Sequence, residues 1–402
     1  MNSDGEFRKS LYPAVAGFAG LSLGIGLLRF AYSPMVPSLI EAHWTTVSQA
    51  AWLGSANFWG YTLGVVIALP LSRHLERHFL LLGAMLIGLT SLVACAWNGG
   101  MEWLVAWRFL QGVTGAIIMA ILPGSVMATV PEQHRRVVGG ITIAGVGFAF
   151  VPSLLIPLVN PYGPSGEWIM SAVLGVFCTL VAAPFIIKHL RGRAPRSAST
   201  PRMPRHYRWS FLLLLATYTL AGVCLIPDAL FLSNYLDQNL HTSPIIAGTL
   251  FSWFALGLGV GAVMGGIIAH RYGSLISILV LTGIGIASNS VILFGSVASV
   301  VSLAAFFFAI WAGGTVSIGS IRTLELAGPD AHARFWPMMC FVYSVGMWIA
   351  SSGFAEMLSR GFGYVVFFWF VEGCAVVFLV LILASYWSAA RSRPETCQSQ
   401  PG

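Results

Sequence analysis

The stretch "VAWRFLQGVTGA", residues 105–116, places one arginine, Arg108, in a run of otherwise apolar, small or uncharged residues. Arg108 lies about six residues beyond Glu102, which corresponds to roughly 9 Å of helical rise. A charge near the middle of a membrane-spanning helix costs about 2.5–3.5 kcal/mol even on the lenient insertion scale. If this run spans a membrane, the arginine has to face protein or water rather than lipid.

The composition is that of a membrane protein. Of the 402 residues, 57% are hydrophobic and only 9% are Asp, Glu, Lys or Arg, whereas a soluble domain carries about 25% of these charged residues. Apolar runs of about 20 residues, long enough to cross a bilayer, recur from Leu11 almost to the C-terminus. The first run is too long for the core of a signal peptide, so we expect a retained helix in an all-α integral membrane protein.

Polar, charged and Gly/Pro-rich punctuation divides the chain into twelve predicted transmembrane helices. They cover approximately residues 12–40, 48–71, 79–97, 102–129, 137–159, 167–188, 209–236, 244–269, 274–295, 299–325, 335–358 and 363–388. A basic, proline-rich segment divides them six and six. We therefore expect an N-terminal six-helix bundle (1–187), a cytoplasmic linker (188–208) and a C-terminal six-helix bundle with a cytoplasmic tail (209–402).

The positive charges indicate the orientation in the membrane. Of the 21 Lys and Arg residues, all but four fall in one set of alternate loops and ends. Only Arg360 falls in the opposite set, while Arg29, Arg108 and Arg322 lie inside predicted helices. The positive-inside rule then places both termini in the cytoplasm. Orientation also explains the net charge of +7 better than nucleic-acid binding does, since the charges do not interleave with aromatic residues on one face.

A weak internal repeat relates the two halves. A shift of 198 residues superposes the starts of both halves and lays "ALPLSRHLER" (68–77) on "GIIAHRYGSL" (266–275). This places Arg73 on Arg271. Secondary transporters show such repeats between their halves.

These features together resemble the major facilitator superfamily over nearly the whole chain. They are the two sets of six helices, the basic central segment, the repeated turn, and the pattern Arg108-x-x-Gln111-Gly112, which in that superfamily belongs to the fourth helix of proton-coupled carriers. The turn "GGIIAHRYG" (265–273) resembles the family's G-x-x-x-D-R-x-G turn, but His270 stands where the acid is usual, and Ser72 stands there in the first copy.

The opening stretch "GIGLLRFAYSPMVP" (24–37) is further similar to the YbfB/YjiJ-type branch of bacterial carriers. This resemblance implies two pseudo-symmetric six-helix bundles in a bacterial inner membrane. It also implies a solute cavity lined by helices 1, 4, 7 and 10.

The fourth helix carries a stripe of polar and small residues. Steps of three and four residues connect Arg108, Gln111 and Gly112 along one side of the helix. We expect Arg108 and Gln111 to face the cavity and bind solute, with Arg108 also taking part in proton coupling. The alternative is that Arg108 extends to the headgroups, which would not require the Gln-Gly continuation.

The first and seventh helices carry opposite charges at matching depths in the membrane. Arg29 lies about ten residues from the outer end of helix 1, and Asp228 about eight residues from the same face in helix 7. We predict that Arg29, Arg108 and Asp228 converge, with Arg29 binding solute. Since a nearby arginine changes a carboxylate's affinity for protons, Asp228 is the candidate proton carrier. Alternatively, Asp228 only pairs with an arginine in a closed state.

Other candidates follow from helix position alone. Tyr218, Asn234 and Thr315 are expected to orient the solute. Gly112, Arg73 and Arg271 are expected to act in gating. Glycines at G-x-x-x-G spacing, as at Gly257 and Gly261, allow close helix packing, which is the alternative to a sliding surface.

No paired catalytic acids, nucleophile with a base, or metal-ligand cluster is recognisable. We therefore expect no enzyme activity, no metal and no cofactor. The arginine excess favours a small anionic or carboxylate-bearing solute, moved by proton-coupled alternating access through a monomer in the lipid bilayer. The 13% aromatic content favours the alternative of proton-driven efflux of amphipathic compounds. A carrier-like receptor that binds without transport is the alternative of another class.

Overall fold

The computed structural model describes residues 3–192 and 204–391, and within these ranges every regular element is helical. Residues 193–203 of the expected linker and most of the expected tail lie outside the described residues. The long helices are α1 (Ser3–Leu21), α3 (Val47–His74), α4 (Arg77–Cys95), α5 (Met101–Met127), α8 (Gly163–His189), α9 (Arg208–Ile226), α11 (Pro244–Tyr272), α12 (Ser274–Phe294), α13 (Ala298–Ala327), α14 (Pro329–Ser359) and α15 (Val365–Arg391). The shorter helices are α2 (Val36–Glu41), α6 (Glu132–Ala144), α7 (Phe150–Val159) and α10 (Leu232–Asn239).

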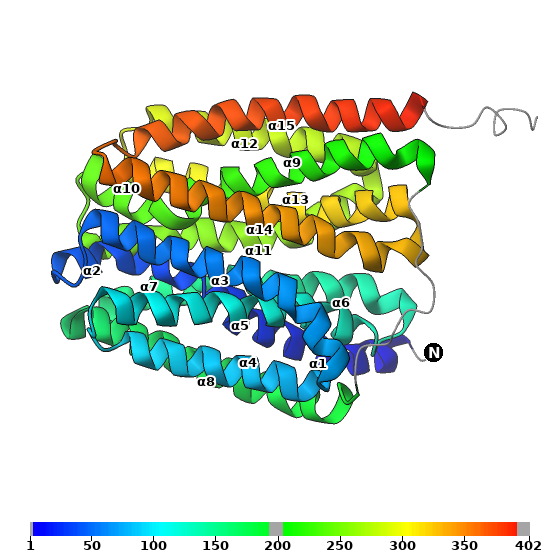
Figure 1. Cartoon of the computed structure of the whole chain (residues 1–402), viewed down its shortest axis with the longest axis horizontal. Coiled ribbons are helices and arrows are strands. Elements are labelled where there is room, and N and C mark those ends of the chain that lie inside the picture. The colour runs from blue at the N-terminus through cyan, green and yellow to red at the C-terminus, as the bar shows by residue number, and fades with distance from the viewer. Residues whose placement is uncertain (1–2, 193–203, 392–402) are drawn as a thin grey trace, which may run out of the picture.

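The helices form two stacked groups (Figure 1). We call α1–α8 the N-terminal half and α9–α15 the C-terminal half. The start of α1 and the last turn of α15 lie at one end of the molecule, the terminal end, whereas α2 and α10 lie at the opposite, distal end. This arrangement confirms the predicted all-helical membrane architecture.

Ten helical stretches of the described residues are long and apolar enough to cross a membrane. One of them, Glu132–His189, has 58 residues and contains α7 and α8, which pack against each other. The 28-residue helix α3 is not among the ten, but it packs between α5 and α14. The arrangement is consistent with the twelve expected passes.

Local sequence signals define where the helices begin and end. Thr46 and Gln49 form a capping box at the start of α3, with hydrogen bonds of 3.3 and 2.9 Å between side chain and backbone. Ser243 caps α11 in a similar way. Gly273 and Gly328, with φ of 83° and 80°, form the turns before α12 and α14, a backbone conformation that favours glycine. These turns set the antiparallel order of the helices.

The first and seventh transmembrane segments are both irregular at the same register of the repeat. In the first, a π-helical turn ends at Leu27 (Ser22–Leu27), and a 3₁₀ turn (Phe30–Met35) begins after Arg29, whose φ and ψ of −121° and −61° are not helical. In the seventh, a π-helical turn (Pro227–Phe231) separates α9 from α10. Proline lacks the N–H that would continue the α-helix. The 198-residue shift lays Arg29 on Pro227, so both halves are irregular at equivalent depth.

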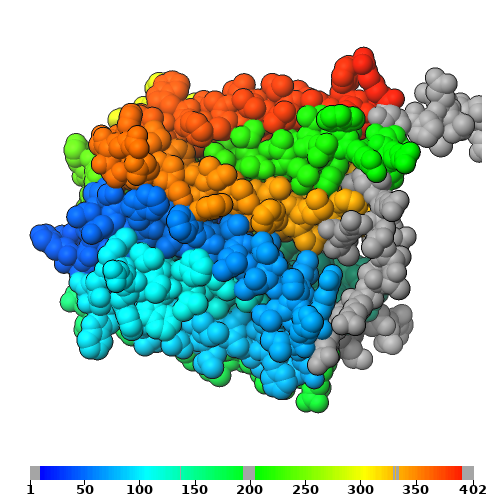
Figure 2. Space-filling model, in the orientation of Figure 1, coloured from blue at the N-terminus to red at the C-terminus, as the bar shows by residue number. Residues whose placement is uncertain are grey.

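The two halves contact each other through several helices, and two groups of contacts are the largest. On one face, α3 of the N-terminal half packs against α14 of the C-terminal half, along the seam that Figure 2 shows. The other contact joins α11 to α6, α7 and the 3₁₀ turn between them (Gly145–Ala149). A Cβ atom added at Gly147 would lie 2.7 Å from the Ala255 carbonyl oxygen of α11. The backbones of the two halves therefore touch directly in this state.

Candidate functional site

A cavity of about 70 Å³ lies between the two halves. Its walls include Arg29 and Tyr61 from the N-terminal half, and Leu225, Val316 and Tyr343 from the C-terminal half. Among the described residues that line it, Arg29 is the one with a charged side chain. The cavity thus lies at the contact of the two halves, with a guanidinium group in its wall.

Arg29 is buried in an aromatic environment. It is 7% exposed, and its Cζ atom lies 4.4 Å from the ring centroid of Phe58, 4.5 Å from that of Tyr61 and 5.4 Å from that of Phe30. Its Nη2 atom donates to the sulfur of Met347 across the interface, while its Nε atom has no hydrogen-bond partner. Within the described part of the chain, Arg29 forms no ion pair with a carboxylate.

Arg108 is 2% exposed and holds the break in the first segment. Its Nη1 atom donates to the Leu28 carbonyl oxygen at 3.2 Å and to Gln111 Oε1 at 2.7 Å. The Asn57 amide donates to the same Leu28 oxygen at 3.0 Å, and the Tyr32 ring centroid lies 4.1 Å from Arg108 Cζ. Arg108 thus faces protein rather than the headgroups, and it satisfies a carbonyl that the helix break leaves free.

Gln111 and Gly112 lie where the fourth segment packs against its neighbours within the N-terminal half. The Gln111 side-chain amide donates to the Cys95 sulfur of α4 at 3.5 Å. A Cβ atom at Gly112 would lie 2.7 Å from the Tyr61 backbone nitrogen of α3. Gly112 therefore permits close packing of α5 on α3, whereas its gating role stays a prediction.

Asp228 lies in the irregular part of the seventh segment. It is fully buried, and neither of its carboxylate oxygens has a hydrogen-bond partner within residues 3–192 and 204–391. The turn Pro227–Phe231 packs against the 3₁₀ turn that directly follows Arg29. Among the described residues, no ion pair joins Asp228 to Arg29 or Arg108 in this state. The segments that carry Arg29 and Asp228 thus pack against each other, but the expected charge pair is not formed here, and the convergence of Arg108 with them stays a prediction.

The remaining candidates lie away from the central cavity. Tyr218 and Thr315 line a cavity of about 10 Å³ inside the C-terminal half, and Asn234 donates to the Tyr364 hydroxyl. Arg73 and Arg271 are exposed at the ends of α3 and α11, and neither forms an ion pair within the described ranges. Their roles in binding and gating stay predictions.

The structure adds residues that the sequence did not single out. The two arginines contact Asn57, Tyr61 and Met347. In the sequence, the spacing of four residues between Asn57 and Tyr61, which places both on one face of a helix, could have indicated the first two. Glu167 of α8 is also fully buried. Its Oε2 atom accepts a hydrogen bond of 2.7 Å from Ser38, while Oε1 has no partner. Its local sequence does not distinguish this buried glutamate from an exposed one at the end of a loop.

Comparison with known proteins identifies the class of protein. The model of a family described as "Uncharacterised MFS-type transporter YbfB" matches residues 21–384. The chain is therefore a transporter of the major facilitator superfamily and not an enzyme. Within that superfamily it belongs to the YbfB-type family, as the resemblance implied.

Curated relatives are similar over almost their whole length. The uncharacterized MFS-type transporter YceJ of Bacillus subtilis (strain 168) is 22% identical over 396 residues, covering 95% of this chain and 98% of the relative. The inner membrane transport protein YdhP of Escherichia coli (strain K12) is 23% identical over 408 residues, covering 96% and 97%.

A solved structure has the same fold. It is a bacterial homologue of the human lysosomal transporter Spinster, in an inward-facing and unoccupied conformation. The TM-score is 0.68 at 15% identity, over 95% of this chain and 97% of that one. Its inward-facing, occupied form gives a TM-score of 0.69. The family membership and the fold together make the chain a multi-pass membrane transporter, and transporters of this superfamily carry small-molecule solutes.

Proposed function

We propose that this transporter moves a small anionic or carboxylate-bearing solute by alternating access of its two halves. One observation supports this most strongly. Arg29 is buried in the wall of the cavity between the halves and has no carboxylate partner among the described residues. A buried charge without a partner is costly, so an anion that pairs with the guanidinium would bind favourably.

We further propose that proton binding at Asp228 drives the transport. An ionised carboxylate whose oxygens are buried and unpartnered is strongly disfavoured, so we infer that Asp228 is protonated in the state described here. When the halves move, water or an arginine can reach the carboxylate and favour release of the proton. In this scheme the ion pair of Asp228 with an arginine also acts as a gate, because the pair forms when the proton is released.

The remaining assignments follow the same scheme. The bundles 1–187 and 209–402 are proposed to move against each other, joined by a cytoplasmic linker at 188–208. The proposed setting is a bacterial inner membrane with both termini in the cytoplasm, because the positive charges concentrate at the terminal end. A monomer contains the whole cavity, so we propose that the protein works as a monomer.

Binding of candidate solutes to variants of Arg29 tests the proposed charge preference. Purified protein is screened by thermal shift against metabolite anions and lipophilic cations, since a ligand of the folded state raises apparent stability. We expect anions to stabilise the wild type. In Arg29→Gln their binding should weaken at least about tenfold, because a hydrogen bond to a charged group contributes about 1.5–3 kcal/mol.

The controls separate a lost charge from a lost fold. Arg29→Lys keeps the charge and should retain part of the affinity, while Arg360→Gln, which removes an exposed arginine paired with Glu356 at 2.8 Å, should bind as the wild type does. Equal anion binding by Arg29→Gln and wild type would contradict the proposal. Binding without solute accumulation or exchange in reconstituted vesicles would instead indicate a receptor.

Efflux of amphipathic compounds is the second candidate, supported by a different cavity. A groove of about 370 Å³ between the fifth and eighth transmembrane segments is lined by apolar residues and glycines, including Phe148, Phe150 and Met264. Such a lining suits lipophilic compounds. Stabilisation by lipophilic cations alone, undiminished in Arg29→Gln, would favour this function over anion transport.

A further inference from the structure

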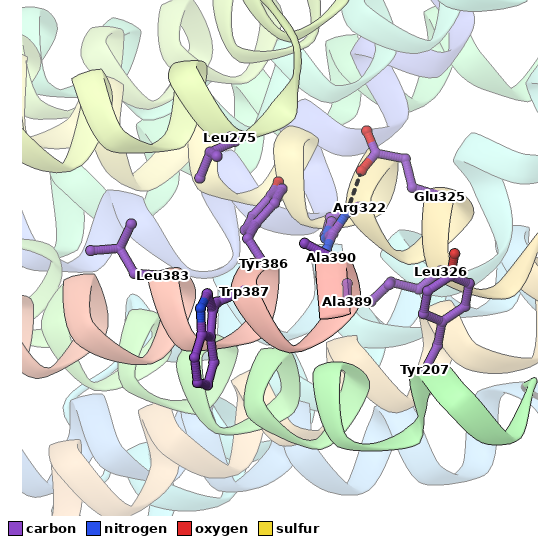
Figure 3. A pocket seen from close by; sticks show the side chains of 10 residues that line it. All are labelled: Tyr207, Leu275, Arg322, Glu325, Leu326, Leu383, Tyr386, Trp387, Ala389 and Ala390. Carbon is purple, nitrogen blue, oxygen red and sulfur yellow. Dashed lines mark hydrogen bonds and ion pairs between the residues drawn. The ribbon is translucent and has the colours of Figure 1, made fainter. Parts of the chain in front are cut away.

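Another cavity, separate from the site between the halves, lies at the terminal end of the C-terminal half. Its volume is about 670 Å³. Figure 3 shows its lining, which comes mainly from the last turns of α13 and α15. Tyr207, just before α9, and Leu275, at the start of α12, complete it. We call it the terminal pocket.

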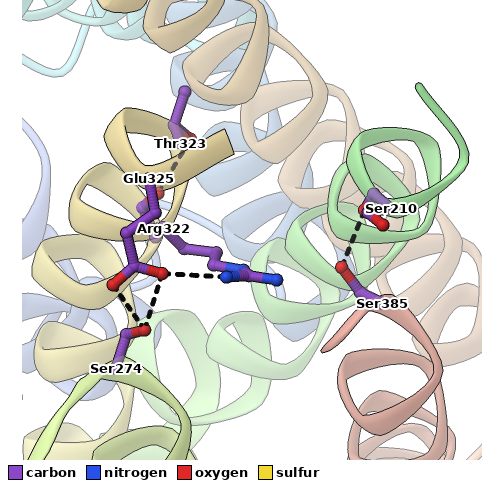
Figure 4. Close-up of polar contacts among 7 residues, drawn as sticks. Ser210, Ser274, Arg322, Thr323, Glu325 and Ser385 are labelled. Atoms are coloured by element: carbon purple, nitrogen blue, oxygen red, sulfur yellow. Dashed lines mark hydrogen bonds and ion pairs between the residues drawn. The ribbon is translucent and has the colours of Figure 1, made fainter. Parts of the chain in front are cut away.

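Arg322 of α13 is the buried charge in the terminal pocket. It is 8% exposed, and its Cζ atom lies 3.7 Å from the ring centroid of Tyr386. Its Nη1 atom donates to Glu325 Oε2 at 2.9 Å. The carboxylate of Glu325 also accepts hydrogen bonds of 2.7 and 2.9 Å from Ser274, so it is held on the α12 side (Figure 4). Arg322 and Glu325 thus form an ion pair within one helix, and Arg322 is buried.

One edge of the Arg322 guanidinium is unused. Its Nε and Nη2 atoms are both buried and have no hydrogen-bond partner among the residues that the structure describes. These two donors share one edge of the planar group, and such an edge matches two oxygens of a phosphate or carboxylate. Leaving them unpaired is unfavourable, so this edge would pair with an anion once a rotation of the Arg322 or Tyr386 side chain exposes it to the pocket.

The rest of the lining indicates which anion fits. Leu275, Leu326, Leu383 and Trp387 give the pocket apolar walls, and Trp387 is 58% exposed. Arg391 adds a second cation at the rim, with its Cζ atom 3.5 Å from the Trp387 ring centroid. A lipid has this combination of an anionic phosphate and apolar chains.

The depth of the site also suits a lipid headgroup. Arg322 lies about five residues before the end of α13, which is roughly 7.5 Å of helical rise. We propose that the terminal pocket binds the phosphate of an anionic phospholipid, with two phosphate oxygens on Nε and Nη2 of Arg322 and the acyl chains beside Leu383 and Trp387. The bound lipid connects the ends of α13 and α15.

Native mass spectrometry of the purified full-length protein tests this. The protein is mixed with phosphatidylglycerol or with phosphatidylcholine of the same chain length, and retained lipid is counted. We expect selective retention of phosphatidylglycerol by the wild type. Retention by Arg322→Gln should fall about tenfold or more, as loss of charge-assisted hydrogen bonds implies, and Arg322→Lys should recover part of it. Arg191→Gln removes an exposed arginine at the same end and should retain lipid as the wild type does.

Glu325→Gln distinguishes lipid binding from a purely structural ion pair. Without the competing carboxylate, the guanidinium should hold phosphatidylglycerol at least as well as in the wild type. Loss of lipid in Glu325→Gln equal to that in Arg322→Gln would overturn the proposal, as would equal retention by Arg322→Gln and wild type. Displacement of the lipid by millimolar inorganic phosphate would show that the ligand is a soluble anion. If Arg322→Gln does not fold, Arg322→Lys and Glu325→Gln decide the question.

Discussion

The glycine contact between the halves predicts that one methyl group can shift the conformational equilibrium. A Cβ atom at Gly147 would lie 2.7 Å from the Ala255 carbonyl oxygen and 2.8 Å from the Gly259 nitrogen. Both are backbone atoms of α11, so the halves themselves have to move apart. Overpacking of this kind costs about 1–3 kcal/mol, which corresponds to about a 5- to 150-fold change in an equilibrium. Gly147→Ala should therefore depopulate the state described here by that factor.

A graded series of variants makes this prediction specific. A Cβ atom at Gly259 would lie 3.0 Å from the Ala144 carbonyl oxygen, and one at Gly266 of the same helix would have no neighbour within 4 Å. The effect should therefore decrease from Gly147→Ala to Gly259→Ala to Gly266→Ala. All three substitutions raise helix propensity by up to about 1 kcal/mol, so Gly266→Ala corrects for that contribution.

Distances between spin labels at the distal end report the equilibrium. Labels at Ala42 and Gln238, both exposed, are placed in a variant without other reactive cysteines and measured by pulsed electron resonance. We expect a longer-distance population to grow in Gly147→Ala, and the distribution in Gly266→Ala to match that of the unsubstituted protein. Equal distributions for all three glycine variants would refute the idea that this contact defines the state.

Three further predictions concern buried polar groups. Asp228→Asn should abolish the dependence of uptake on a pH gradient while solute exchange continues; gradient-driven uptake at the wild-type level would contradict proton carriage. Asn57→Ala removes a hydrogen bond to the Leu28 carbonyl and should lower the free energy of unfolding by about 1–3 kcal/mol, visible as a lower Tm. Glu167→Gln keeps a partner for Ser38 and should be tolerated, whereas Glu167→Ala leaves a void and should lower Tm; equal Tm values would indicate that the contact with Ser38 is dispensable.

The burial of the arginines could be predicted because the cost of exposing them to lipid is large. The depth of Arg29 and Arg108 in their helices follows from counting residues, and the lipid-facing alternative is expensive at that depth. The partner of Arg108 could not be predicted in the same way. It is a backbone carbonyl, that of Leu28, and it is available only because the first helix breaks there. That break depends on packing between segments distant in sequence.

The orientation of uncharged polar residues was harder to predict. Tyr218 and Thr315 lie on the expected helices but line a cavity inside the C-terminal half. Each residue turns about 100° around the helix axis, so an uncertainty of one residue in register moves a side chain to another face. Arg322 shows the same limit, because Tyr386 of α15 covers it, and that contact has no local sequence signal.

The two irregular segments give the halves opposite chemistry at equivalent positions. In the described part of the chain, the first carries Arg29, a cation without a carboxylate partner, and the seventh carries Asp228, an acid without a hydrogen-bond partner. In the proposed scheme, protonation of Asp228 favours binding of an anion at Arg29, because it removes a negative charge that would repel the anion. Binding free energies are reciprocal, so the solute should favour protonation as much as the proton favours solute binding. Coupling of solute and proton binding then needs no ion pair between Arg29 and Asp228 in this state. It needs only that the surroundings of both irregular segments change together when the halves move.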